Sequence, residues 1–251
     1  MLEPVTQIKS HIQSAANHFG YAIKRYPELD QYLQTFLGKF EVNCVLDVGA
    51  HTGEYYRILR SIGYKHRIIS FEPSRASYRE LQAAAGHDPL WTGFNIGLSD
   101  SDTDTEINVY SRSEFNSLYE LDDEARRSYH LDPGAPLKER ITLRRLDNVL
   151  SECLPALGDA RIFMKIDTQG HDLAVVKGTE AFRDRLCGIQ SELAGVRVYG
   201  NIPLMHEALA FYCSIGFVPS YFGAVNTFST TMVTPEWDVI FRRKPDRLAE
   251  L

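Results

Sequence analysis

The sequence lacks the features that mark membrane, secreted and disulfide-rich proteins. It contains no run of about 18 apolar residues, so we expect no membrane-spanning helix. Its first residues show no basic start followed by an apolar core, which is the pattern of a secretion signal. Its four cysteines form no C-x-x-C pair, which favours buried thiols over a disulfide framework. From these absences we expect a cytoplasmic protein.

An excess of positive charge is absent as well. The chain has 27 Lys and Arg residues against 33 Asp and Glu residues, which gives a formal net charge of −6. Proteins bind the phosphates of nucleic acids through clustered Lys and Arg side chains. This balance therefore argues against a nucleic-acid partner. The remaining composition is that of an ordinary globular protein of 251 residues.

What the chain does contain is a change of hydrophobic pattern near residue 43. Within residues 1–42, the apolar side chains between Leu29 and Phe40 recur at helical spacing, which predicts an N-terminal helical segment. We expect its apolar stripe to cover a core or a homodimer partner, or to roof a substrate site. Residues 43–251 instead alternate short apolar runs with helical patterns. That alternation predicts an α/β domain with a parallel sheet and helices on both faces.

Residues 111–140 interrupt this alternation. They are polar with scattered aromatic residues, and insertions of this length are usually functional loops or disordered segments. We interpret the insertion as a lid over a substrate, because aromatic faces beside polar groups suit carbohydrates and polyketides alike. The candidate lid residues are Phe115, Asn116, Ser117, Tyr119, Tyr129 and His130. The stretch 141–150 is expected to lead back into the sheet.

A glycine loop follows the first predicted strand of this domain. The segment Asp47-Val48-Gly49-Ala50-His51-Thr52-Gly53 leads into a helix, and Glu72 ends the next predicted strand. Parallel sheets bind ligands beyond the carboxyl ends of their strands, where a carboxylate suits the two hydroxyls of a ribose. The loop lacks the third glycine of G-x-G-x-x-G, and Asp47 would repel the pyrophosphate of a dinucleotide. S-adenosylmethionine, which carries a sulfonium and an ammonium, suits an acidic loop better.

Four parts of the chain carry a resemblance to a known family. They are residues 45–53, Phe71-Glu72-Pro73, residues 95–100, and residues 165–173 with Val176-Lys177-Gly178. Together they resemble the FkbM family of S-adenosylmethionine-dependent O-methyltransferases, over residues 43 to 195. The resemblance implies a Rossmann-like class I methyltransferase fold, with a seven-stranded, mostly parallel sheet and an antiparallel last strand. It also implies a small-molecule or glycan acceptor, namely a hydroxyl on a sugar of a glycolipid or polysaccharide or on a macrolide-type natural product.

Carried over by position, the resemblance assigns cofactor-binding residues. Those expected at the methionine end of S-adenosylmethionine are Asp47, Gly49, Ala50, His51 and Gly53. Glu72 is expected to hold the ribose. Those expected near the adenine are Asn95, Ser99 and Asp100. Many family members carry Val-Glu-Gly where this chain has Thr168-Gln169-Gly170. Because that glutamate is missing and no His or Cys cluster has ligand spacing, we expect no bound metal.

The chemistry of methyl transfer directs attention to the ends of two later strands. Transfer to a hydroxyl is an in-line displacement, for which the protein aligns the acceptor and removes its proton. Asp167, at the end of a predicted strand, is the first candidate for the base or for a group that orients the acceptor. His171, whose imidazole titrates near neutral pH, is the second, and Glu192 is the third. A helix cap for Asp167 and a surface position for His171 are the purely structural alternatives.

Two other functions remain compatible with the sequence. The chain could be a cofactor-binding partner subunit that has lost catalysis, which turnover of labelled S-adenosylmethionine would distinguish. It could also be an NAD-dependent oxidoreductase, although the missing glycine and the acid before Gly49 count against that. A titration with both cofactors would separate these two classes.

Overall fold

A seven-stranded sheet forms the centre of the fold, in the order β3-β2-β1-β7-β8-β10-β9. The computed structural model describes His18 and residues 28–129, 131, 135–153, 160–228 and 233–245. The strands of this sheet are β1 (Cys44–Val48), β2 (Arg67–Phe71), β3 (Trp91–Phe94), β7 (Ile162–Ile166), β8 (Leu186–Ala194), β9 (Phe217–Phe228) and β10 (Val233–Arg243). Neighbouring strands are parallel among β3, β2, β1, β7 and β8. The strand β10 runs antiparallel to both β8 and β9. The predicted Rossmann-like sheet with an antiparallel last strand is confirmed.

The central strands of the sheet are apolar because helices cover both of its faces. Every residue of β1 and β7 is buried, and strands buried on both faces read as nearly continuous apolar runs. Two ionisable residues interrupt these runs. Asp47 and Lys165 are partners in the register of the two strands, so they lie side by side. Burying such groups is costly unless they are paired, and the register of the two strands allows this pairing.

Two apolar clusters hold helices against the sheet. One cluster includes α2 (Leu29–Lys39) and α3 (Glu54–Ser61). The other includes α6 (Leu146–Cys153), α7 (Asp172–Lys177) and α8 (Met205–Ser214). The helix α4 (Arg75–Ala85) follows β2, and the 3₁₀ helix η2 (Glu180–Arg185) precedes β8. Among the described residues, no helix combines the length and the apolar character needed to cross a bilayer.

The helix predicted ahead of the sheet is part of its core. It is observed as α2, which buries Leu33, Phe36 and Leu37. The ring of Phe36 lies 5.3 Å from that of Phe163 on β7, centroid to centroid. Packing therefore joins this part of residues 1–42 to the domain that was expected to begin at residue 43. Apart from His18, residues 1–27 lie outside the described residues, so the homodimer remains a prediction.

A second, smaller sheet includes the first part of residues 141–150. It contains β4 (Gly97–Leu98), β5 (Thr103–Val109) and β6 (Leu137–Arg144), in the order β4-β6-β5. Ile141 pairs with Thr105 of β5, so the first part of this stretch joins the smaller sheet. The rest of the stretch belongs to α6, which leads back to the main sheet at β7.

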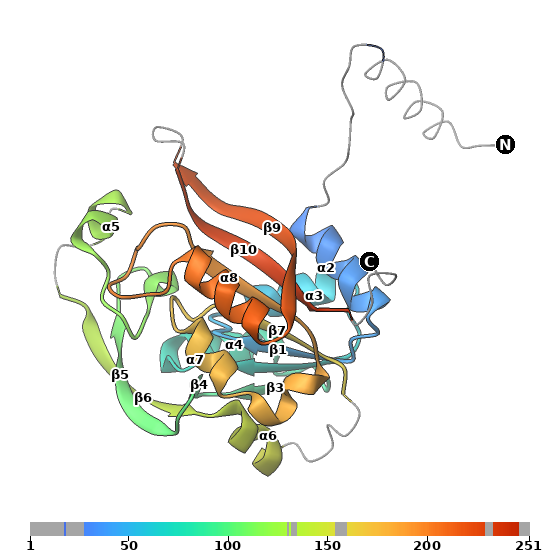
Figure 1. Cartoon of the computed structure of the whole chain (residues 1–251). Coiled ribbons are helices and arrows are strands. Elements are labelled where there is room, and N and C mark those ends of the chain that lie inside the picture. Colours follow the sequence, from blue (N-terminus) through green and yellow to red (C-terminus); the bar gives the residue numbers. More distant parts are fainter. Residues whose placement is uncertain are drawn as a thin grey trace.

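The insertion, residues 111–140, follows β5 and includes the first residues of β6. It contains the 3₁₀ helix η1 (Ser113–Phe115) and the helix α5 (Asp123–Ser128). Figure 1 shows β5, β6 and α5 extending to one side of the main sheet. Phe115 and Leu121 are buried in an apolar cluster with Tyr199, which follows β8. The described part of the insertion is therefore packed onto the domain and does not stand apart as a solvated loop.

Candidate active site

A cavity of about 780 Å³ opens beyond the carboxyl ends of the central strands. It lies beside β1 and β7, where the strand order reverses, because the chain proceeds from β1 to β2 on one side and from β7 to β8 on the other. Open α/β sheets bind ligands at such a switch point. The volume falls within the range of small-molecule and cofactor sites. The position and size of the cavity therefore suit a cofactor together with a substrate.

The loop after β1 is shaped by left-handed backbone conformations. The φ angles are 73° at Gly49, 48° at His51 and 93° at Gly53, a region that favours glycine. The N–H groups of Gly49 and Ala50 both donate to the last carbonyl of β2, at 3.0 Å. A side chain at Gly49 would collide with the carbonyl oxygen of Asp167. Gly49, Ala50 and His51 line the cavity. Gly53 does not line it and lies at the start of α3.

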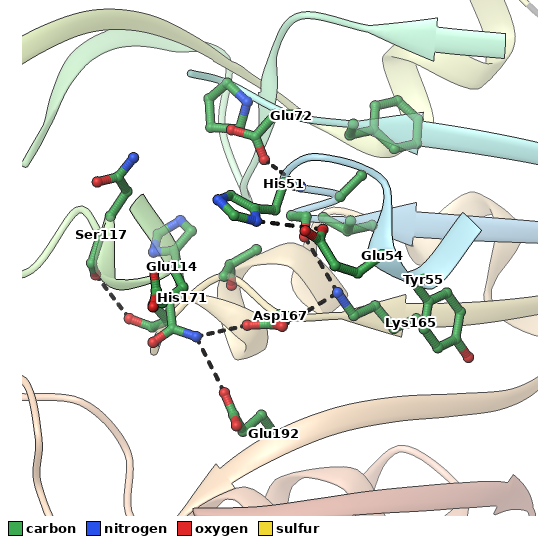
Figure 2. A pocket seen from close by; sticks show the side chains of 18 of the residues that line it. His51, Glu54, Tyr55, Glu72, Glu114, Ser117, Lys165, Asp167, His171 and Glu192 are labelled. Carbon is green, nitrogen blue, oxygen red and sulfur yellow. Dashed lines mark hydrogen bonds and ion pairs between the residues drawn. The ribbon is translucent and has the colours of Figure 1, made fainter. Parts of the chain in front are cut away.

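Glu72 presents a buried carboxylate to the cavity, and its side chain is only 7% exposed. Its Oε2 accepts a hydrogen bond at 2.8 Å from the N–H of His51 (Figure 2). Its Oε1 accepts one from the N–H of Ser74, also at 2.8 Å. Each carboxylate oxygen retains a second lone pair for a ligand. Burial raises the pKa of Glu72 to about 7, against the lowering effect of the two backbone hydrogen bonds. This arrangement suits two hydroxyl donors on one ligand.

Asp47 occupies a different place from the expected one. It is 0% exposed and does not line the cavity. Its Oδ1 lies 3.7 Å from Nζ of Lys165, which also lies 3.4 Å from Oδ2 of Asp167 and donates to the carbonyl of Gly49 at 3.3 Å. Burial raises the pKa of Asp47 to about 6, against the opposing effect of Lys165. Asp47 therefore forms a buried ion pair with Lys165, and Lys165 lines the cavity.

Burial alone would lower the pKa of Lys165. The carboxylates of Asp167 and Asp47 outweigh this effect, and the pKa of Lys165 lies above its usual value. The ammonium therefore stays charged at neutral pH. It joins the loop after β1 to the turn after β7, because its partners belong to both.

One part of the cavity wall is apolar, and the smaller sheet supplies most of it. Its residues are Phe71, Leu98, Ile107, Ile141 and Leu143. Asn95, which was expected near an adenine, does not line the cavity. Asn95 donates to the carbonyls of Glu72 and Pro73, at 2.9 and 3.0 Å, and so supports the backbone that carries the Glu72 carboxylate. Ser99 and Asp100 do not line the cavity either.

A second polar group lies at the ends of β7 and β8. Asp167, Gln169 and Glu192 all line the cavity. The amide Nε2 of Gln169 donates to Oδ1 of Asp167 at 2.8 Å and to Oε2 of Glu192 at 3.2 Å. Burial, together with the carboxylate of Asp167, raises the pKa of Glu192 well above its usual value. Asp167 instead contacts a charged ammonium and an amide donor, which hold its carboxylate from two sides.

His171 lines the same cavity but is held by two hydroxyl groups. Its Nε2 lies 2.9 Å from Oγ of Ser99, and its Nδ1 lies 3.2 Å from the hydroxyl of Tyr119. Burial lowers the pKa of His171 below its usual value, against the opposing effect of Asp100. Both ring nitrogens are therefore engaged on a neutral imidazole. This geometry favours a supporting role for His171 over proton abstraction.

Most of the candidate lid residues are found at or near the cavity. Phe115, Asn116, Ser117 and Tyr129 line it, and Tyr119 reaches it through His171. His130 lies outside the described residues. Two hydrogen bonds tie the insertion to the loops below, because Oγ of Ser113 lies 2.7 Å from Nε2 of His51 and Oγ of Ser117 donates to the carbonyl of Gln169 at 2.8 Å.

Three functional contributions were missed by sequence reasoning. The sequence did contain a sign of Lys165, because a lysine is unusual within an apolar run such as 162–166 that predicts a buried strand. Gln169 was noted only as a departure from the family pattern. The apolar wall from the smaller sheet had no signal, because its residues look like ordinary core positions.

The cavity wall carries more carboxylates than cations. The acidic residues that line it are Asp30, Glu54, Glu72, Glu114, Asp167, Glu192, Glu236 and Asp238, against the cations Arg112 and Lys165. Within the part of the chain that the structure describes, no group of three His, Cys, Asp or Glu side chains is arranged to hold a metal ion. The wall therefore favours neutral or positively charged ligands over polyanions.

The sequence of the chain is similar to a known protein family and to part of one larger protein. The family model described as the methyltransferase FkbM domain matches residues 47–219. The AMB antimetabolite synthetase AmbE of Pseudomonas aeruginosa is 30% identical over 164 residues, which cover 54% of this chain and 8% of that protein. The chain thus corresponds to a small part of that relative.

Two solved structures are similar to this chain at low sequence identity. The methyltransferase domain of bacterial CtHen1-C is 11% identical, with a TM-score of 0.45 and coverage of 86% of this chain and 97% of that one. Fibrillarin from Aeropyrum pernix, solved with natively bound S-adenosyl-L-methionine, is 11% identical, with a TM-score of 0.45 and coverage of 79% and 66%.

Proposed function

Because the chain belongs to the FkbM methyltransferase family, we propose that it is an S-adenosylmethionine-dependent O-methyltransferase. The proposed acceptor is a hydroxyl of a sugar, whether in a glycolipid, a polysaccharide or a glycosylated natural product. The acidic wall of the cavity supports a neutral or cationic acceptor rather than a nucleic acid, whose phosphates would be repelled.

A single observation carries this proposal: one cavity is lined both by the Glu72 carboxylate, the proposed ribose ligand, and by the separate carboxylate of Asp167, the proposed base. Glu72 lies at the end of β2, and Asp167 lies directly after β7. Figure 2 shows Glu72 and Glu192 on opposite sides of the view, with Asp167 between them. A ribose held at Glu72 and a hydroxyl held at Asp167 can therefore occupy the same cavity, as transfer between two bound molecules requires.

The residues present fit the proposed cofactor. Glu72 offers two buried oxygens, already aligned by backbone donors, to the hydroxyls of a ribose. The apolar wall at Leu98, Ile107 and Leu143 suits the flat face of an adenine. When it is bound, S-adenosylmethionine supplies a methyl group that its sulfonium already activates.

The remaining chemistry falls to the protein. A sugar hydroxyl is a poor nucleophile, and a positioned base contributes roughly 10²–10⁴-fold to the rate. Asp167 is the proposed base, because Lys165 and Gln169 hold its carboxylate from two sides at 3.4 and 2.8 Å. Phe115 and Tyr129 of the insertion would cover the acceptor and exclude water.

Turnover with labelled S-adenosylmethionine tests the proposal. The purified chain would be incubated with a panel of free sugars, glycosylated natural products, amino sugars and short RNAs. We expect transfer of the label to a hydroxyl of a sugar-bearing acceptor, located by mass spectrometry and NMR. Transfer to nitrogen or to RNA would contradict the proposed acceptor. Cofactor binding without any transfer would favour a silent partner subunit.

A further inference from the structure

The side-chain amide of Gln169 bridges two carboxylates at the ends of neighbouring strands. Its single NH₂ group donates to Oδ1 of Asp167 at 2.8 Å and to Oε2 of Glu192 at 3.2 Å. An NH₂ group has two hydrogens, enough for one hydrogen bond to each of the two carboxyl groups. The amide nitrogen therefore lies in the position where a cation shared by the two carboxylates would lie.

The orientation of this amide is set by groups on its other side. The hydroxyl of Tyr199, a side chain that is only 1% exposed, donates to Oε1 of Gln169 at 2.8 Å. The opposite orientation would place Oε1 against the carboxylate of Asp167, where two acceptors would face each other. The NH₂ end is thus directed at the carboxylates.

The backbone of Gln169 is also held in an uncommon conformation. Its φ angle is 51°, in the left-handed region that few side chains adopt. Its carbonyl oxygen accepts a hydrogen bond at 2.8 Å from Oγ of Ser117, a buried residue of the insertion. Strained backbone persists where the surrounding structure stabilises it, and it clusters at functional sites. Tyr199, from the segment after β8, therefore holds the side chain of Gln169, whereas Ser117 of the insertion holds its backbone.

We propose that the Gln169 amide takes the place of a divalent cation between Asp167 and Glu192, and that it positions Asp167 for the acceptor. The first half of this proposal concerns the unliganded protein alone. The second half, the positioning of a base, rests on the proposed function. Gln169 acts through Asp167 and is a positioning residue.

The proposal makes a specific claim about one substitution. Gln169→Glu keeps the length of the side chain but replaces the bridging donor with a third carboxylate. Carboxylate oxygens are the ligands that hard divalent cations prefer. The variant should therefore bind Mn²⁺ where the natural chain does not. Gln169→Ala removes the donor and leaves two carboxylates, so its affinity for Mn²⁺ should lie between those of Gln169→Glu and the natural chain.

Titration of each full-length protein with Mn²⁺, followed by electron paramagnetic resonance, tests this order. Gln82→Glu, the same change at an exposed position of α4, is the matched control. We expect Gln169→Glu to bind Mn²⁺ at least tenfold more tightly than the natural chain and the control. The added Asp167→Asn change should abolish this gain. If Gln169→Glu fails to fold, the comparison of Gln169→Ala with the natural chain decides the question.

Two results would overturn the proposal. One is a natural chain that binds Mn²⁺ as tightly as the folded variants do. The other is Gln169→Glu or Gln169→Ala that folds without any gain in Mn²⁺ affinity. S-adenosylhomocysteine binding, measured on the same samples, keeps the two ideas apart. If the variants bind Mn²⁺ in the predicted order of affinity but no protein binds S-adenosylhomocysteine, the first half of the proposal is kept and the methyltransferase function is rejected.

The positioning role has a separate readout in steady-state kinetics. With an acceptor from the panel above, Gln169→Met should lower kcat at least tenfold and leave KM for S-adenosylmethionine unchanged. A purely structural role would change both parameters or neither. An unchanged kcat in a variant that binds S-adenosylhomocysteine normally would contradict the positioning of Asp167 by Gln169.

Discussion

The two ends of the cavity are built in different ways. At the end formed by β1 and β2, backbone groups hold the key side chain, because Glu72 accepts hydrogen bonds from two main-chain N–H groups. At the end formed by β7 and β8, side chains hold one another, because Asp167, Gln169, Glu192 and Lys165 form one connected set. Backbone geometry survives changes of side chain, whereas a network of side chains can be altered by one substitution. The first end therefore suits the proposed cofactor, and the second end is the one where single substitutions should change the proposed chemistry most.

The largest expected effect lies at the side-chain end. Asp167→Asn keeps the shape of the residue and removes the proposed base, so kcat should fall by roughly 10²–10⁴-fold. Binding of S-adenosylhomocysteine should be retained, because Glu72 is untouched. The measurement is steady-state turnover at saturating cofactor.

Asp184→Asn is the control for this change. Asp184 is exposed and lies in η2, which leads into the start of β8, at the opposite end of that strand from Glu192. A near-normal kcat in Asp167→Asn would mean that alignment alone drives the transfer or that the base lies elsewhere. The claim that the end formed by β7 and β8 supplies the base would then be wrong.

The next largest effect lies at the backbone end. Glu72→Gln should weaken S-adenosylhomocysteine binding by at least about tenfold, because hydrogen bonds to a charged acceptor are roughly twice as strong as neutral ones. The fold should be unchanged, which circular dichroism would check. Glu80→Gln, at an exposed position of α4, should bind as the natural chain does. Equal calorimetric affinities in both variants would move the ribose site away from Glu72.

The pH dependence of cofactor binding sharpens the same contrast. Burial raises the pKa of Glu72 from its ordinary value of 4.5 to about 7. Below that pH the free carboxyl is protonated, and ribose hydroxyls require the ionised form. Binding should then release a proton, so affinity should rise with pH, by at most about tenfold per unit, and level off above pH 7.

For the unliganded chain the sign of this linkage is reversed. Because the folded state holds the proton more tightly than the unfolded state, the contribution of Glu72 to the free energy of unfolding falls as the pH rises from 4.5 to about 7. Calorimetry of S-adenosylhomocysteine binding in two buffers with different ionisation enthalpies would measure the proton release. The same affinity at pH 5.5 and pH 8, with no proton released, would contradict this account.

The smallest expected effect belongs to His171. Its two ring nitrogens are already paired with Ser99 and Tyr119, so His171→Ala should lower kcat by less than about tenfold. If His171 were instead the base, kcat would rise with pH through its lowered pKa, and the rise would disappear in the variant. A pH profile of both proteins distinguishes these outcomes.

The fold and the backbone end of the cavity could be predicted from the sequence. Runs such as 44–48 and 162–166 are long and apolar enough to show buried parallel strands, and the glycines of the loop mark its left-handed turns. The position of Glu72 at a strand end followed from the same pattern. These features are local, so neighbouring residues in the chain specify them.

The side-chain end could be predicted only in part. Asp167 and Glu192 follow from their places at strand ends, but no local pattern shows that Gln169 lies between them or that Tyr199 orients it. The resemblance assigned Asp47 to the methionine end of the cofactor. In the structure Asp47 pairs with Lys165, which lies on a strand more than a hundred residues away in the chain. Contacts of that kind depend on strand order and register, which the sequence of one chain does not reveal.

A thermal-shift experiment with two cofactors tests the central claim most directly. A ligand that binds only the native state stabilises it by about 2.7 kcal/mol at a hundredfold excess over Kd. The account predicts that S-adenosylhomocysteine raises the Tm of the natural chain, that Glu72→Gln reduces this shift, and that NAD⁺ has no effect. A Tm raised by NAD⁺ and unmoved by S-adenosylhomocysteine would contradict it.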